Sequence, residues 1–109
     1  MNNVDETLRQ RGSRYGSYSD VSALTVEIFG PVWRKMQGRQ EFKPYHVEAL
    51  HMICNKMARA VCGDPMYIDS WRDISGYATL VVNTLNEQDG ASDSKVSSIT
   101  RSLGKWSDD

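Results

Sequence analysis

The segment KMARAVCGDPMYIDSWRDISGYATLVV, residues 56–82, decides the fold. It contains the basic end of one helix, a Gly-Asp-Pro corner at residues 63–65 and the start of a second helix. Glycine is favoured just past a helix C-terminus and proline cannot continue a helix, so the corner separates the two helices. A connection this short places neighbouring helices antiparallel and in contact. The segment therefore predicts a helical hairpin.

Apolar residues recur at helical spacing on both sides of this corner. The pattern predicts a helix from Pro44 to about Val61, because proline suits the first turn of a helix. It predicts that Gly63 ends this helix in the C′ position. The next helix is expected to start at Asp69 or Ser70 and to run to about residue 86.

The N-terminal part of the chain shows two further helical patterns. The first covers residues 3–11 and is expected to end at Gly12, followed by a loop over residues 12–20. A second helix, capped by Ser19 or Asp20, is expected to end near Gly38. The Gly-Pro pair at residues 30–31 predicts a kink or a break within it.

The C-terminal part is polar at residues 87–95 and then again apolar at helical spacing. The positions Val96, Ile99, Leu103 and Trp106 predict a short amphipathic helix that packs on the body or on a partner chain. The fold class is therefore all-α, a compact bundle of about four helices plus this C-terminal helix. The organisation is a helical domain over residues 1–88, followed by a linker and C-terminal helix over residues 89–109.

Composition limits the function. The 109 residues are 39% hydrophobic and carry a net charge of −1, so the strong basic excess of a general nucleic-acid binder is missing. No apolar run is long enough for a membrane span and no signal peptide is present, which predicts a cytoplasmic protein. A chain this short buries a small share of its surface, so we expect a homo-oligomer. Cys54 and Cys62, about 12 Å apart along one helix, are expected to be reduced.

Familiar catalytic and metal motifs are missing from the sequence. It contains no phosphate-binding loop of the G-x-x-x-x-G-K-[ST] type, no G-x-G-x-x-G, no C-x-x-C and no H-E-x-x-H. His46 and His51 are five residues apart, so they lie on different faces of their helix. We therefore expect no zinc site and no bound cofactor.

A cluster of polar side chains surrounds the Gly-Asp-Pro corner. Cations precede it and acids follow it on helices that are expected to touch, so the cluster is either an ion-pair network that fixes the hairpin register or a binding site. Arginine and lysine suit phosphates, carboxylates accept from ribose or base donors, and aromatic rings stack on bases for roughly 1 to 3 kcal/mol. The candidate binding residues are Arg11, Arg14, Tyr15, Lys56, Arg59, Asp64, Asp69, Trp71, Asp73 and Tyr77.

Four segments resemble a known family. The segments are RGSRYGS at residues 11–17, NKMAR at 55–59, GDP at 63–65 and DSWRDISGYA at 69–78. Together they resemble small phage and prophage proteins of uncharacterised function, which are often described as MazG-like. The resemblance implies a compact all-α fold related to the MazG-type nucleotide pyrophosphohydrolases. Those enzymes hold Mg²⁺ with an E-E-x-x-E run that faces an E-x-x-D run. Here Asp73 matches the final aspartate, but Ser70 replaces the glutamate and residues 44–61 offer only Glu48, which favours direct phosphate binding over hydrolysis.

Three hypotheses follow from these observations. The first is a phage-encoded, non-enzymatic nucleotide-binding protein, in its sharpest form a sponge in the host cytoplasm. It would sequester a nucleotide messenger of host immunity, such as a cyclic oligonucleotide or an ADP-ribose derivative. The second is a Mg²⁺-dependent nucleotide pyrophosphohydrolase that uses Glu48, Asp69 and Asp73. The third is a small protein-binding adaptor whose contact is the C-terminal amphipathic helix.

Overall fold

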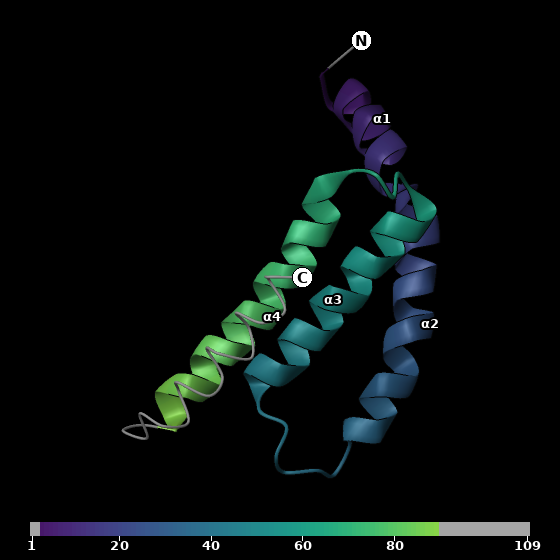
Figure 1. Ribbon diagram of the computed structural model, residues 1–109. Coiled ribbons are helices and arrows are strands. Elements are labelled where there is room, and N and C mark those ends of the chain that lie inside the picture. Colours follow the sequence, from purple (N-terminus) through teal and green to yellow (C-terminus); the bar gives the residue numbers. More distant parts are fainter. Residues whose placement is uncertain (1–2, 90–109) are drawn as a thin grey trace.

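The computed structural model describes residues 3–89, which form four helices and no strand. This arrangement confirms the predicted all-α class, and Figure 1 shows the helices in order along the chain. Their bounds are α1 Asn3–Tyr15, α2 Tyr18–Met36, α3 Pro44–Cys62 and α4 Ile68–Gln88. The helix predicted around residues 96–106 lies outside the described residues. None of the four helices is apolar over a length that could cross a lipid bilayer.

Helix α3 lies between α2 and α4 and packs against both (Figure 1). Short connections make α3 antiparallel to each neighbour, as the Gly-Asp-Pro corner predicted. Helix α1 approaches the C-terminal end of α3 and extends beyond it (Figure 1). Three helices thus form one layer, and the fourth lies at one end of that layer.

The boundary between α1 and α2 differs from the prediction. Helix α1 continues through Gly12 to Tyr15, and the loop predicted over residues 12–20 shrinks to a short break at Gly16. Gly16 has a φ of +86°, which side chains disfavour, and it packs directly on Cys62. Neither of the predicted caps is used, because the Ser17 hydroxyl accepts the first-turn N–H of Asp20 at 3.1 Å instead.

Pro31 does not break α2, although the Gly-Pro pair predicted a kink or a break. The helix runs past it to Met36 and ends before Gly38, whose φ is +79°. Proline leaves the carbonyl of Glu27 without its helical donor. Both residues are exposed, so water can satisfy that carbonyl and the helix continues.

The corner between α3 and α4 is fixed by its own polar groups. The Asp64 carboxylate accepts the N–H of Met66 at 2.9 Å, and the Trp71 indole N–H donates to the Pro65 carbonyl at 2.8 Å. These bonds hold the connection over residues 63–67 against the first turn of α4. Asp64 and Trp71, which the sequence offered as ligand-binding residues, are therefore placed as supports of the corner.

Gly63 ends α3, but its conformation is not the left-handed one expected of a C′ glycine. Its φ is −112°, so the requirement for glycine comes from close packing. A Cβ at this position would overlap the Arg14 carbonyl oxygen and would lie 2.5 Å from the Tyr15 carbonyl carbon. The next amide, of Asp64, donates to the same Arg14 carbonyl at 2.8 Å. The ends of α1 and α3 are thus joined backbone to backbone.

Small side chains form the interior of the layer. Ala58 and Ala60 of α3 and Ser70 of α4 are almost fully buried, and no larger side chain of residues 3–89 is buried as completely as Ser70. Burial raises the pKa of the Cys54 thiol, and both cysteines are free, as predicted. The thin interior means that helix spacing depends on the size of these few side chains.

Ser70 offers a direct test of this close packing. Its hydroxyl has no hydrogen-bond partner within residues 3–89, so Ser70→Ala should change the free energy of unfolding by less than about 1 kcal/mol. Ser70→Leu should lower it by about 1 to 3 kcal/mol, because the added volume overpacks the interior. Urea denaturation measures both changes. Ser75→Leu, at an exposed position of α4, is the matched control, and equal stability of the two leucine variants would contradict the prediction.

Candidate functional site

A groove lies where α1, the N-terminal end of α2 and the C-terminal half of α3 meet. It has a volume of about 540 Å³, within the range of small-molecule sites. We call it the basic groove, because two arginines line it together with several hydroxyl and amide groups. Its lining residues are Leu8, Arg11, Gly12, Tyr15, Gly16, Ser17, Tyr18, Val21, Ser22, Asn55 and Arg59.

Two guanidinium groups gather around the Tyr15 ring in this groove. The Cζ atom of Arg59 lies 4.8 Å from the ring centroid, and that of Arg11 lies 5.5 Å from it. Contact with the ring face holds a guanidinium by cation–π attraction and leaves its N–H edge available. The two side chains come from α3 and α1, so the docking of α1 brings them together.

A second ring extends the cluster at the edge of the groove. Tyr67 meets Tyr15 edge-on at 5.5 Å, and Arg14 lies 5.0 Å from the Tyr67 centroid while donating to its hydroxyl at 3.2 Å. The pKa of Tyr67 is raised, first by hydrogen bonding with the Asp69 carboxylate and then by Tyr15, whereas Arg14 lowers it. Tyr67 was not among the predicted residues, because its position before α4 carries no periodic signal.

Within the described part of the chain, the arginines of this cluster form no salt bridge with a carboxylate. Within residues 3–89 the ion pairs are Arg39–Glu41 at 3.2 Å and Lys56–Asp73 at 2.8 Å, and neither includes Arg11, Arg14 or Arg59. Like charges held close together repel one another unless an anion intervenes. The cluster therefore presents three cationic groups around two rings, with the Asp69 carboxylate beside Tyr67.

Lys56 and Asp73, two of the predicted residues, lie in the interface between α3 and α4. The Lys56 side chain is only 10% exposed and is committed to Asp73, whose side chain is 47% exposed. This pair is an ion pair of the kind that fixes a helical hairpin. Tyr77 lies nearby in a separate shallow hollow on α4, together with Arg72, Asp73, Gly76 and Leu80. The predicted cluster is thus divided between the basic groove, the corner and the α3–α4 interface.

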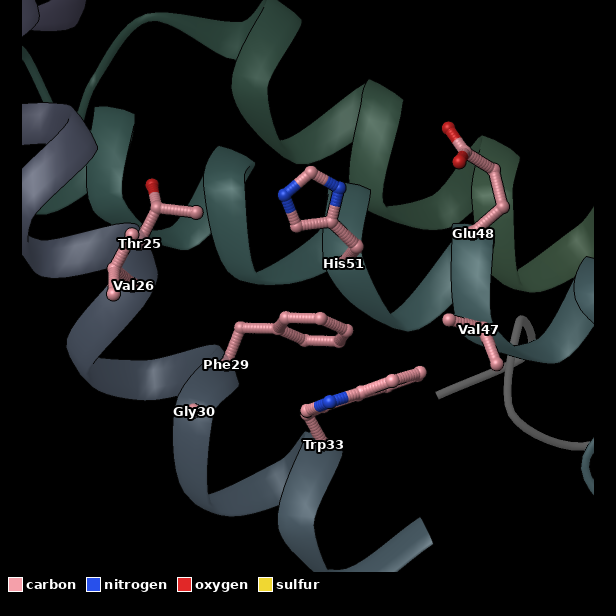
Figure 2. Close-up of a pocket in the computed structure, with 8 residues that line it drawn as sticks. All are labelled: Thr25, Val26, Phe29, Gly30, Trp33, Val47, Glu48 and His51. Atoms are coloured by element: carbon pink, nitrogen blue, oxygen red, sulfur yellow. The ribbon is translucent and has the colours of Figure 1, made fainter. Parts of the chain in front are cut away.

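Another hollow lies between α2 and α3 and has a volume of about 480 Å³. We call it the aromatic pocket, and Figure 2 shows its side chains. The ring centroids of Phe29 and Trp33 are 6.2 Å apart at an interplanar angle of 31°, and His51 lies 4.9 Å from Phe29. Its lining residues are Thr25, Val26, Phe29, Gly30, Trp33, Val47, Glu48 and His51. Phe29 and Trp33 were not among the predicted site residues, although their spacing of four residues on α2 places two rings side by side.

The acidic side chains proposed as magnesium ligands do not converge within the chain. Glu48 lines the aromatic pocket, Asp69 lies beside Tyr67, and Asp73 pairs with Lys56. Residues 3–89 contain no group of three or more histidine, cysteine or acidic side chains placed to hold a metal ion. The described part of a single chain thus lacks the carboxylate arrangement on which the pyrophosphohydrolase hypothesis depends.

Comparisons of the chain with protein-family models, with curated proteins and with solved structures gave no match. The basic groove and the aromatic pocket, with the chemistry of their side chains, are therefore the basis on which a function can be inferred.

Proposed function

We propose that this protein binds a small, phosphate-bearing ligand of the nucleotide class in the basic groove and holds it without converting it. The observation that carries the proposal is the gathering of Arg11, Arg14 and Arg59 around Tyr15 and Tyr67, outside the ion pairs of residues 3–89. Guanidinium groups bind phosphate through paired N–H donors, which gives both affinity and orientation.

Neighbouring groups complete the phosphate site in this proposal. Ser17, Ser22 and Asn55 line the same groove and can donate hydrogen bonds to phosphate oxygens. Helix α2 begins at the groove, and the positive end of its dipole favours an anion there. Tyr18 is 88% exposed at the groove wall, so its ring is available to stack on a ligand. Each group acts by binding, and none is required to transfer a proton.

The sequence resemblance supports a more specific form of the proposal. A phage-encoded protein with such a site would sequester a nucleotide messenger of host immunity, a cyclic oligonucleotide or an ADP-ribose derivative, in the host cytoplasm. The dispersed carboxylates support binding over hydrolysis in this form. The same proposal includes a homo-oligomer, which the exposed side chains of Val61 and Trp71 support, because apolar side chains on the surface favour association.

Calorimetry with wild type and Arg59→Ala tests the proposal. The ligands are cyclic dinucleotides, ADP-ribose and nucleoside diphosphates. Loss of one charged hydrogen-bonding group costs roughly 1.5 to 3 kcal/mol, so the Kd should rise by about 10- to 150-fold. Arg72→Ala removes an arginine of α4 that does not line the basic groove and should leave the Kd unchanged.

Two results would contradict the proposal. One is the absence of binding heat with every nucleotide in the panel. The other is an Arg59→Ala variant that keeps its helical circular dichroism and binds as tightly as wild type. Ligand recovered after heat denaturation should be chemically unchanged, and release of a monophosphate would instead favour the pyrophosphohydrolase hypothesis.

A further inference from the structure

The aromatic pocket continues the basic groove along the same two helices. On α2, Ser22 lines the groove and Val26, one turn further, lines the pocket. On α3, Asn55 lines the groove and His51, one turn earlier, lines the pocket. Because α2 and α3 are antiparallel, the step from Ser22 to Val26 and the step from Asn55 to His51 run in the same direction in space. The two hollows therefore lie end to end.

A side-chain contact joins the two hollows. Asn55 lies in the basic groove and Thr25 lies in the aromatic pocket, and the Asn55 amide donates to the Thr25 hydroxyl at 3.4 Å. Arg59 and His51 are eight residues apart on α3, which separates them by about 12 Å along the helix. A ligand that occupies both hollows must therefore be elongated, with an anionic end and an aromatic end.

We infer that the aromatic pocket holds the base of a nucleotide whose chain of two or more phosphates lies in the basic groove. The inference rests on the proposed phosphate site and adds the base to it. Phe29 and Trp33 are inclined by 31° and form a surface on which a planar base can stack, as their arrangement in Figure 2 shows. Trp33 is 44% exposed, so its ring remains available to a ligand.

Glu48 lies at the rim of the aromatic pocket and is exposed. Figure 2 shows its carboxylate directed away from the rings of Phe29 and Trp33. A base in the pocket is therefore held through its faces by stacking, which every base can provide. The pocket should accept guanine and adenine alike.

Gly30 keeps one wall of the pocket open. It lines the pocket without a side chain, and a Cβ there would meet only the Arg34 guanidinium, at 3.5 Å. The helix would thus tolerate alanine at this position, which makes Gly30→Ala a mild change. A larger residue such as leucine would extend into space that a base needs.

Calorimetry with four probes tests the inference: inorganic pyrophosphate, guanosine diphosphate, inosine diphosphate and adenosine diphosphate. In wild type, guanosine diphosphate should bind at least 10-fold more tightly than pyrophosphate, because base stacking adds roughly 1 to 3 kcal/mol. Trp33→Ala should reduce that advantage to less than 3-fold while the pyrophosphate affinity stays unchanged. Because pyrophosphate occupies only the groove, its binding also shows that the variant is folded.

The three nucleotides give a second readout of the stacking. Guanosine, inosine and adenosine diphosphate should bind with affinities within about 3-fold of one another, because stacking acts on the faces of the base. Equal affinity for the nucleotides and pyrophosphate would overturn the inference and leave the phosphate site standing. Failure of pyrophosphate and all three nucleotides to bind would overturn both.

Discussion

Gly63→Ala is expected to separate α1 from the end of α3 and to weaken ligand binding more than 10-fold. The new Cβ would overlap the Arg14 carbonyl oxygen and crowd the Tyr15 carbonyl carbon and the Gly16 nitrogen. These are backbone atoms, so they cannot rotate away as the end of a side chain would. Relief requires α1 to shift as a whole, which breaks the hydrogen bond from the Asp64 amide to Arg14.

This separation has a structural and a functional consequence. Overpacking of this kind lowers the free energy of unfolding by about 1 to 3 kcal/mol, which urea denaturation measures. The displacement of α1 also carries Arg11 and Tyr15 away from Arg59, so the phosphate site loses its paired arginines. Amide exchange should show faster exchange at Asp64.

Gly12→Ala is the matched control for this prediction. Gly12 lies within α1 and has nothing within 4 Å of a built Cβ, so the added methyl meets open space. Alanine is the better helix former by about 1 kcal/mol, and the variant should be at least as stable as wild type. Unchanged stability and unchanged binding in Gly63→Ala would contradict the proposed role of the close contact.

Asp73→Ala is expected to lower the free energy of unfolding by about 2 kcal/mol. Breaking a fully buried ion pair costs about 3 to 5 kcal/mol, and the loss here is smaller because Asp73 is half exposed. The variant leaves the Lys56 ammonium in the α3–α4 interface without its partner at 2.8 Å. Lys56 is only 10% exposed, so water cannot replace the lost carboxylate. Urea denaturation of the variant and of wild type measures the difference.

Lys56→Met removes the other charge of the same ion pair. Methionine keeps much of the lysine volume without its charge, and the Asp73 carboxylate that remains is 47% exposed to water. We expect this variant to lose less than about 1 kcal/mol, since the remaining charge stays hydrated. The double variant should be more stable than Asp73→Ala alone, and a double-mutant cycle measures the coupling. If Asp73→Ala and Lys56→Met lose the same free energy of unfolding, the predicted difference between the two variants would be wrong.

The fold could be predicted where local sequence and packing agree. Pro44 marks the start of α3 and the Gly-Asp-Pro corner separates α3 from α4, because both depend on backbone restrictions of single residues. The end of α1 could not be predicted in the same way. The segment offers glycines at both 12 and 16, and only the packing of Gly16 on Cys62, distant in sequence, decides between them.

The candidate site could be predicted only in part for a similar reason. Arg11, Tyr15 and Arg59 were proposed and do come together, but the prediction grouped Lys56 with them. A helical repeat indicates which residues share a face, and it does not say which neighbouring helix that face meets. The aromatic pocket was missed because Phe29 and Trp33 have the same periodicity as residues of an ordinary core.

Helix α1 contributes no buried residue, and its contacts with α3 concentrate at its C-terminal end. Its rotation about the Gly16 backbone would widen the basic groove and would break two hydrogen bonds to the corner after α3. One runs from the Asp64 amide to the Arg14 carbonyl and the other from the Arg14 guanidinium to the Tyr67 hydroxyl. The layer of α2, α3 and α4 would remain folded during this motion. A bound phosphate that bridges Arg11 of α1 and Arg59 of α3 would oppose this rotation and lengthen the lifetime of the complex.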